Sequence, residues 1–420
     1  MKKNTRAMRK RQLYTRMILG MAALAVILAV VLIAISCGRQ KQDETQEAAP
    51  AGAESAAVLA GKAEAGESAA VQAAEAAAEG GPDGTGEGNA ASGTAPAEPA
   101  PSAKSTPAGS VGSTPAGRVS IKLTATGDCT LGIDDSFDYD TSFNAAYYEA
   151  DYPGWFFENC MDSLGSDDLT IVNFEGVLSE GGERQEKQYA FRGDPEFVRV
   201  LTEGSVEAAN LANNHSFDYG KDAYEDTKKI LADAGITTFG YDRSVIVEIN
   251  GIKVGLTGTL TLYDEWEAKD GLVEQIEWCR DQGAQLIISS IHWGDEGEYY
   301  PADWQFYLGR AAVDAGADLV IGHHPHRLQP YEIYKGKVIL YSLGNFCFGG
   351  HRSPSDMDSA IYRQTFTFEN GVLLEDTEYS ILPISISSAS DYNNYQPTPL
   401  YGEEAERALG KIYRLEESGS

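Results

Sequence analysis

The sequence is poor in basic residues. It holds 33 lysines and arginines against 63 aspartates and glutamates, which gives a formal net charge of −30. Seven of the basic residues lie in the first block, MKKNTRAMRKRQLYTR, and no later stretch forms a basic patch with interleaved aromatic residues. Because proteins bind nucleic acids largely through lysine and arginine, this composition argues against a nucleic-acid partner and for a soluble acidic body.

Cysteine is rare as well. None of the five cysteines forms a CxxC pair, which argues against a structural zinc cluster. Outside the cytoplasm a disulfide is permitted, but buried free thiols explain the same residues equally well. The cysteines are Cys37, Cys129, Cys160, Cys279 and Cys347.

Aromatic residues are absent from residues 38–118, a segment made mostly of Ala, Gly, Glu, Ser and Pro. Such a segment cannot bury enough apolar surface to offset the entropy lost on ordering. We therefore predict a disordered spacer here, which holds the following domain away from its attachment point.

Residues 1–37 contain the one long apolar run, from Met17 to Ser36, directly after the basic block. Twenty residues in a helix rise about 30 Å, which is enough to cross the hydrocarbon core of a bilayer. The basic flank favours the cytoplasmic side, so the rest of the chain is expected outside, beyond a single-pass anchor. Cys37 allows an alternative, because AISC loosely resembles a lipoprotein processing site. Both hypotheses attach the chain to the outer face of a cell membrane.

The sequence pattern of residues 119–400 is typical of an α/β domain. Alternating apolar strands, such as VSIKLTATGD, are separated by helical patterns such as YGKDAYEDTKKILADA, which ends at Gly235. Hairpin signals, among them two Asn-Gly pairs, indicate antiparallel strands as well. We predict one α/β domain with a mixed sheet, followed by a tail over 401–420.

Metal-type ligands follow five of the predicted strands. The residues are Asp128; Asn173 and Glu175; Asn213, Asn214 and His215; His292, Asp295 and Glu296; and His323, His324 and His326. In α/β sheets the carboxyl ends of the strands are where sites assemble, so these side chains are expected to converge.

Each of these residues has a plainer explanation when it is taken alone. Asp128 is typical of a turn cap, His292 of a core histidine held by a backbone bond, and the histidine triplet of an exposed polar loop. Five such coincidences at strand ends are improbable. Mixed carboxylate, amide and imidazole ligands suit Mn, Fe or Zn, so we predict a divalent metal site with two ions.

The same residues carry a family resemblance from about Val119 to Pro399. The ordered motifs resemble the CapA family, associated with capsule and poly-γ-glutamate biosynthesis, whose domain is similar to the calcineurin-like metallophosphoesterases. The resemblance implies a metallophosphoesterase-like mixed β-sheet sandwich flanked by helices. The motifs are TATGD, NFEG, LANNHSFDYG, IHWGDE, GHHPH and YSLGNFCF.

The resemblance also implies roles for individual residues. Asp128 would bind one metal ion, Glu175 would bridge two, and Asn214 would bind the second. His215 would be the general acid that protonates the leaving group. The rest of the metal shell would come from His292, His323, His324 and His326.

Two departures from the metallophosphoesterase pattern stand out. The histidine expected two residues after the first aspartate is replaced by Thr130. In the histidine loop, either His323 or His324 pairs with His326, and spacing alone does not choose between them.

Two functions therefore compete. The first is a metal-dependent hydrolase outside the membrane that cleaves a bond in an anionic envelope polymer such as poly-γ-glutamate. The second is a non-catalytic or weakly catalytic component of a polymer synthesis and export complex, with a degenerate metal site. Loss of the usual histidine at Thr130 favours the second, whereas the strand-end ligands favour the first.

Overall fold

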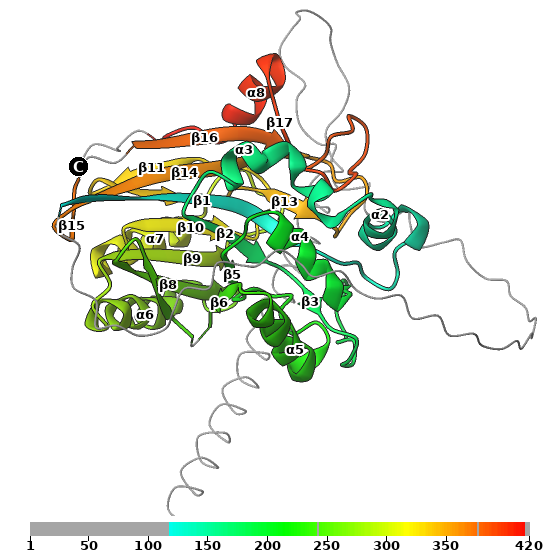
Figure 1. Cartoon of the computed structure of the whole chain (residues 1–420), viewed down its shortest axis with the longest axis horizontal. Coiled ribbons are helices and arrows are strands. Elements are labelled where there is room, and N and C mark those ends of the chain that lie inside the picture. The colour runs from blue at the N-terminus through cyan, green and yellow to red at the C-terminus, as the bar shows by residue number, and fades with distance from the viewer. Residues whose placement is uncertain (1–116, 242, 376–377, 416–420) are drawn as a thin grey trace, which may run out of the picture. The chain divides into compact units, whose positions relative to one another are not determined.

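The computed structural model describes residues 117–241, 243–375 and 378–415 (Figure 1). The predicted leader, membrane anchor, Cys37 and all but the last two residues of the spacer lie outside these ranges. Within them, no helix combines the length and apolar character needed to cross a membrane. The four cysteines that fall in the described ranges, Cys129, Cys160, Cys279 and Cys347, are buried free thiols.

The first sheet is mixed and has nine strands in the order β17-β16-β14-β1-β2-β5-β6, with β13 beside β1 and β15 beside β14. The neighbouring pairs β13-β1, β1-β2, β2-β5 and β5-β6 are parallel, whereas the pairs β1-β14, β14-β16 and β16-β17 are antiparallel. The strand bounds are β1 Arg118–Thr130, β2 Leu169–Phe174, β5 Ala208–Asn210, β6 Thr237–Phe239, β13 Asn345–Phe348, β14 Asp358–Glu369, β15 Val372–Leu373, β16 Glu378–Ser385 and β17 Thr398–Pro399.

The second sheet has six strands in the order β11-β12-β10-β9-β8-β7. Its inner strands are parallel and its two edges are closed by antiparallel hairpins, which turn at Asn250-Gly251 and Lys335-Gly336. All four turn residues have φ between 49° and 80°, as a two-residue hairpin turn requires. The strand bounds are β7 Val245–Ile249, β8 Ile252–Thr261, β9 Leu286–Trp293, β10 Leu319–His323, β11 Tyr331–Tyr334 and β12 Lys337–Leu340.

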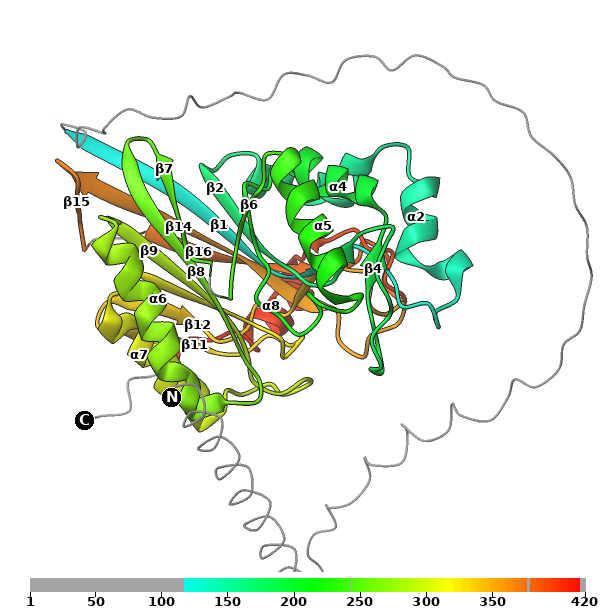
Figure 2. The same cartoon turned by 90° about the horizontal axis from the view of Figure 1, so that it is seen from below.

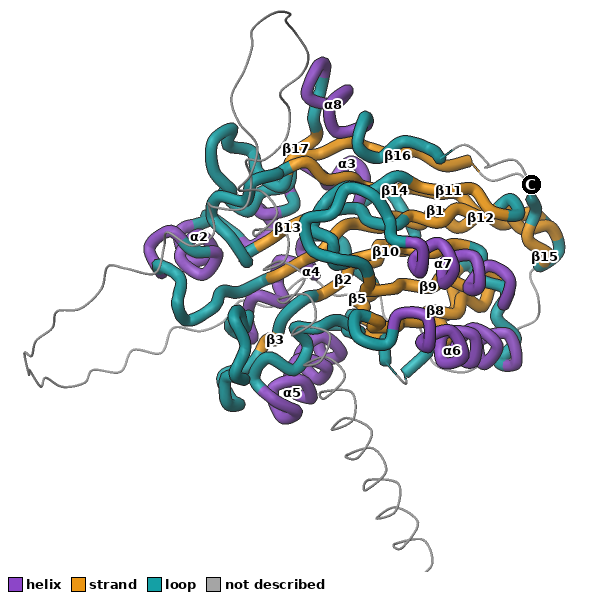
Figure 3. The backbone as a smooth tube through the Cα atoms, turned by 180° about the vertical axis from the view of Figure 1, so that it is seen from behind, coloured by secondary structure: helices purple, strands orange, loops and turns teal. Residues whose placement is uncertain are grey.

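One apolar core lies between the two sheets. Every second residue of these strands contributes its side chain to this core, because alternate side chains of a β-strand point to the same face of the sheet. Leu123 of β1 and Ile171 of β2 meet Ile288 of β9 and Ile321 of β10 in this layer, and all four are at most 1% exposed. The strands of the two sheets lie in neighbouring layers in Figures 1 and 3.

Helices cover the outer face of each sheet. The second sheet packs against α6 (Lys269–Asp281) and α7 (Asp303–Ala315) through a core that includes Ile287 and Trp293. Other helices cover the first sheet around Phe174, and those that Figure 2 labels lie on the opposite side from α6 and α7. These are α2 Phe143–Glu149, α3 Met161–Leu164, α4 Val198–Glu203 and α5 Gly220–Asp233. The predicted α/β fold, with mixed sheets flanked by helices, is confirmed.

The segment after β17 also packs onto the described domain. The helix α8 (Gly402–Leu409) lies against β14 and β16, and Ala408 and Ile412 reach the core between the sheets. A small two-stranded sheet, β3 (Val177–Leu178) with β4 (Arg192–Gly193), borders the edge at which β1 and β2 end.

Candidate metal centre

The two sheets bring their predicted polar residues together at one edge. In the first sheet, strand register places Asp128 of β1 beside Asn173 of β2, and Glu175 follows one residue after β2. In the second sheet, His292 of β9 is paired with His323 of β10. The neighbouring ends of β1 and β10 are in contact, so these residues line one site across the sandwich.

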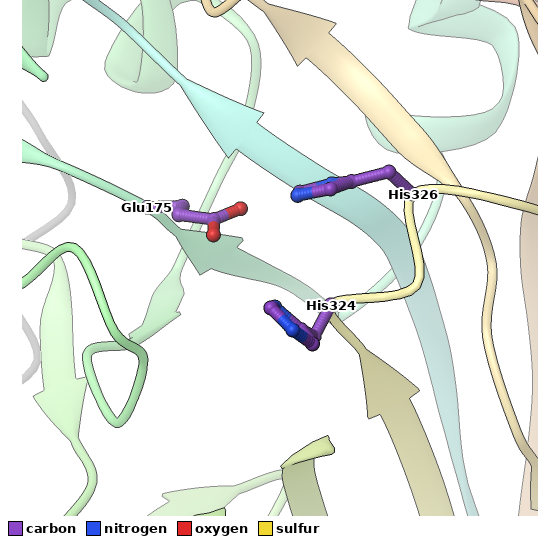
Figure 4. Close-up of side chains that lie close together, drawn as sticks. All are labelled: Glu175, His324 and His326. Atoms are coloured by element: carbon purple, nitrogen blue, oxygen red, sulfur yellow. The ribbon is translucent and has the colours of Figure 1, made fainter. Parts of the chain in front are cut away.

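A carboxylate and two imidazoles form the middle of the site. One ligand atom each of Glu175, His324 and His326 lies within 4.8 Å of the others, and Figure 4 shows the three side chains facing one another. Both histidines have positive φ, 98° at His324 and 53° at His326. Such backbone conformations are costly for residues other than glycine and gather at functional sites. The turn at this loop is therefore what directs both rings toward Glu175.

Glu175 has an environment that favours a cation beside it. It is fully buried, and neither carboxylate oxygen has a hydrogen-bond partner among the described residues. Burial raises the pKa of Glu175 to about 8, and the nearby charge of Asp128 adds to the rise. The nearest imidazole nitrogens are His292 Nε2 at 3.6 Å and His215 Nε2 at 3.9 Å from Oε1. An unpaired buried carboxylate is costly, and a bound cation would relieve the cost.

Asp128 is equally buried but well supplied with partners. Its Oδ1 accepts from Asn173 Nδ2 at 2.9 Å, and its Oδ2 accepts from the backbone N–H of His324 at 3.2 Å. Histidine nitrogens lie close too, with His323 Nδ1 3.2 Å from Oδ1 and His326 Nδ1 3.1 Å from Oδ2. Burial acts to raise the pKa of Asp128, but these contacts outweigh it and hold the pKa well below its usual range.

Two histidines of the site are held neutral. Burial lowers the pKa of His292 well below its usual value and that of His324 to about 3, and the neighbouring histidines add to both effects. A neutral imidazole has a free lone pair and is the form that binds metals. The Nε2 of His292 lies 2.9 Å from Asn214 Oδ1, so an imidazole and an amide ligand are already side by side.

His326 differs from these two because it faces both carboxylates. Burial acts to lower the pKa of His326, but Glu175 and Asp128 outweigh it and raise the pKa. Its Nδ1 also lies 2.8 Å from Asn345 Oδ1, at the start of β13. A cation bound between the carboxylates would replace the proton that this arrangement attracts.

His215 is oriented by a neighbouring carboxylate. Its Nδ1 lies 2.7 Å from Asp218 Oδ2, which leaves Nε2 directed toward Glu175. Asp218 is held in turn by the backbone N–H of Phe191 at 2.6 Å and by Lys187 Nζ at 2.7 Å. Lys187 also donates to the carbonyl of Asn214 at 3.0 Å. The ring of His215 therefore has one tautomer and one orientation imposed on it, while burial lowers its pKa.

Three asparagines beneath the site form hydrogen bonds that hold its backbone and side chains in place. Asn210 Nδ2 donates to Asn173 Oδ1 at 3.0 Å, and Asn213 Nδ2 donates to the carbonyl of Phe174 at 2.8 Å. Asn213 Oδ1 accepts from the backbone N–H of His215 at 3.1 Å. Asn213 of the LANNH turn is thus a structural support that holds the backbone of His215.

Every residue that the sequence predicted as a ligand or general acid lies at this edge. The grouping with Glu175 favours His324 over His323 as the partner of His326. Asp295 and Glu296 lie on the exposed loop after β9. Thr130 is fully buried, and its hydroxyl has no hydrogen-bond partner among the described residues.

Sequence reasoning missed Lys187, Asp218 and Asn345. The aspartate three residues after His215, in the LANNHSFDYG motif, was the available signal for Asp218. Lys187 belongs to a polar loop with no pattern of its own, and its contact with Asp218 spans 31 positions. Asn345 lies in the motif YSLGNFCF, to which the sequence analysis assigns no functional residue.

Comparison with known proteins places these motifs in a family. Residues 122–350 match the family model described as bacterial capsule synthesis protein PGA_cap. The chain is 32% identical over 274 residues to the capsule biosynthesis protein CapA of Bacillus anthracis, a match that covers 58% of this chain and 63% of the relative. It is 30% identical over 247 residues to the PGA biosynthesis protein CapA of Bacillus subtilis, covering 53% and 63%.

A third relative comes from Mycobacterium tuberculosis. This probable polyglutamine synthesis accessory protein is 30% identical over 257 residues, which cover 52% of this chain and 66% of the relative. The chain thus spans a little less than two thirds of the length of the curated relatives it matches.

Proposed function

Since the chain belongs to the bacterial capsule synthesis protein PGA_cap family, we propose that it acts in capsule or poly-γ-glutamate biosynthesis as a metal-dependent hydrolase. The observation that carries the catalytic part is Glu175, a fully buried carboxylate with two unpaired oxygens that faces neutral histidines. Such an arrangement is costly in a purely structural role and is suited to holding cations.

The residues present fit divalent metal ions. Glu175, Asp128, His324, His326, Asn214 and His292 would hold them, and Glu175 is grouped with His324 and His326. This mixture of carboxylate, amide and imidazole ligands suits Mn, Fe or Zn. When bound, such ions act as Lewis acids and make water a better nucleophile at neutral pH.

The chain itself supplies proton transfer and orientation. In its protonated form His215 would donate the proton on Nε2 to the leaving group and become neutral, while its Nδ1–H stays bonded to Asp218. Asp218 and Lys187 hold the ring in place, as the orienting carboxylate does in other hydrolases. The asparagines under the site keep the LANNH turn rigid, so the acid stays within reach of the centre.

One observation favours the alternative, a non-catalytic component of a polymer synthesis complex. Thr130 is buried where a metal-binding histidine is expected, so the metal shell has one imidazole fewer than the usual pattern. In that case the site would bind polymer or a single ion without cleaving a bond.

The predicted location is part of the proposal too. We place the described domain outside the cytoplasmic membrane, attached through Met17–Ser36 or through a lipid on Cys37. The polymer and any synthesis complex are then the expected partners.

Hydrolysis by the full chain tests the proposal directly. With Mn²⁺, Fe²⁺ or Zn²⁺ present, we expect cleavage of a chromogenic phosphodiester or of γ-linked glutamate oligomers. His215→Ala should reduce kcat by about 10²–10⁴-fold, the range typical of a lost general acid, while the bound metal is kept. A chain that binds no metal and shows no activity with any of these ions would contradict the hydrolase and leave the non-catalytic component.

A further inference from the structure

Arg327 directly follows the histidine loop and has unusual partners for this acidic chain. Its Nη1 donates to the carbonyl of His326 at 3.2 Å and its Nη2 to Ser355 Oγ at 2.6 Å. The guanidinium carbon lies 5.7 Å from the centre of the Tyr299 ring. Among the described residues, no carboxylate forms an ion pair with Arg327, and its buried Nε has no hydrogen-bond partner.

Other cations near the site are paired with acids. Arg184 contacts Asp134 at 2.6 Å, and Lys187 contacts Asp218 at 2.7 Å. A guanidinium has five N–H donors in a fork that matches a carboxylate. Arg327 therefore keeps its charge unpaired, and Nη1 and Nη2 each keep one N–H that the contacts with His326 and Ser355 do not use.

A polar cavity of about 480 Å³ lies beside this arginine. Tyr299 and Ser355, the two side chains that contact Arg327, both line it, and several serine hydroxyls form the wall beyond them. Three acids line it: Asp356 and Asp358 are paired with Lys411, at 2.6 Å and 2.7 Å, and Glu404 lies near the charge of Arg407. The cavity thus offers hydroxyl groups for an extended polar chain, and Arg327 lies between it and the histidine loop.

We propose that Arg327 determines specificity by binding a carboxylate of a γ-linked glutamate chain that runs from the serine-lined cavity to the metal centre. The inference rests on the proposed function for the identity of the polymer. The charge and planar fork of Arg327 select a carboxylate, and Tyr299 and Ser355 hold the fork in position.

Calorimetric binding of a γ-linked glutamate hexamer to the full chain tests this inference. The titration is made with a chelator present, so that neither metal binding nor hydrolysis contributes. We expect Arg327→Gln to weaken binding by about tenfold or more, as the loss of a charge-assisted hydrogen bond does. Arg327→Lys, which keeps the charge but not the fork, should fall between Arg327→Gln and the unaltered chain.

Arg363→Gln is the matched control. Arg363 also donates to a serine hydroxyl, Ser166 Oγ at 2.9 Å, and forms no ion pair among the described residues, but it lies on β14 away from the histidine loop. Its loss should leave the affinity unchanged. The neutral γ-linked glutamine hexamer should bind weakly, and equally to the unaltered chain and to Arg327→Gln.

Equal binding of the glutamate hexamer by the unaltered chain and by a folded Arg327→Lys and Arg327→Gln would overturn the inference. So would no measurable binding by the unaltered chain, or an equal loss in Arg363→Gln. Because the readout is binding without metal, a failure to hydrolyse would defeat the proposed catalytic function and leave the role of Arg327 standing. If the chain hydrolyses the polymer but substitutions of Arg327 leave binding unchanged, the catalytic function stands and the role of Arg327 is overturned.

Discussion

Glu175 and Asp128 are both fully buried carboxylates, yet their surroundings shift their pKa values in opposite directions. Burial acts to raise the pKa of Asp128, but His323 and His326 outweigh it and hold the pKa low, while Asn173 and the His324 backbone donate hydrogen bonds to the same carboxylate. Glu175 receives no such bond from the described residues, and its pKa rises to about 8. At the scale of single residues, the centre therefore contains one carboxylate stabilised by the protein and one whose unpaired oxygens a bound cation would satisfy.

Asp218 is predicted to act on catalysis through His215 alone. Asp218→Asn keeps the shape of the side chain but removes the charge that fixes the Nδ1–H tautomer. We expect kcat to fall by about 10²–10⁴-fold, with unchanged metal content and KM. Steady-state kinetics and metal analysis of the same preparation measure both quantities. A variant with full activity, or one that loses its metal, would contradict this role.

At the scale of elements, turns and close contacts between strands position the residues of the metal centre. Only part of this arrangement could be predicted from the sequence. Strand ends carry polar residues in a visible pattern, so Asp128, Glu175 and His292 could be predicted together. The choice between His323 and His324 depends on a φ of 98° at His324, which no spacing rule reveals. Lys187 reaches the site from a loop and Asn345 from the start of the short strand β13, and neither segment has a periodicity to interpret.

The contact between β1 and the Gly344–Asn345 backbone is one such unpredicted feature. A Cβ atom at Gly127 would lie 2.2 Å from the carbonyl oxygen of Gly344, so only glycine fits before Asp128. We expect Gly127→Ala to destabilise the fold by roughly 1–3 kcal/mol, as overpacking does, and to weaken metal binding by displacing Asp128.

Chemical denaturation and metal titration of Gly127→Ala measure these two effects. Gly271→Ala in α6 is the control, because its added methyl group meets no atom within 4 Å and φ is ordinary. It should leave stability unchanged or raise it by about 0.4–1 kcal/mol. Equal behaviour of the two variants would contradict the packing explanation.

The attachment of α8 is predicted to depend on pH. Asp358 is buried and contacts Arg407 Nη2 and Lys411 Nζ, each at 2.7 Å. Burial acts to raise its pKa, but these bonds outweigh it and lower the pKa. The stabilisation is therefore present above the unfolded pKa of about 3.9 and is lost as pH falls through the lower folded value.

Replacing Asp358 by Asn should cost about 1–3 kcal/mol at pH 7, a range reduced by the half-exposed Arg407, and less near pH 3. Urea denaturation at the two pH values measures the difference. Asp314→Asn, which removes an exposed pair with Lys335, should stay within about 0.5 kcal/mol at both. A cost for Asp358→Asn that does not change with pH would contradict an ionic contribution.

At the scale of the whole molecule, the proposal places an acidic domain on the outer face of a membrane behind a long spacer. The α/β class of the described domain could be predicted, because composition changes sharply at residue 119, whereas the anchor and the spacer before it stay predictions. The division into two packed sheets with α8 against them could not, since strand pairing across more than 200 positions, as in β1 with β14, leaves no local signal.

Replacing Cys37 by Ser distinguishes the two modes of attachment. If Met17–Ser36 is an uncleaved anchor, the variant should stay with the membrane fraction at its normal apparent mass. If Cys37 carries the lipid, processing should fail and the mass should rise by that of the retained leader. Fractionation followed by mass spectrometry makes the measurement, and recovery of the unaltered full-length chain in the soluble cytoplasmic fraction would contradict both.

The most direct test of the account is the metal content of the purified chain, measured by inductively coupled plasma mass spectrometry. We predict about two divalent ions per chain, because a site of this kind holds a pair flanking the reacting oxygen. Glu175→Gln should retain at most one, since the unpaired carboxylate between the two ligand groups is lost. A chain without metal after exposure to Mn²⁺, Fe²⁺ and Zn²⁺, or a Glu175→Gln variant with the same content as the unaltered chain, would contradict the account.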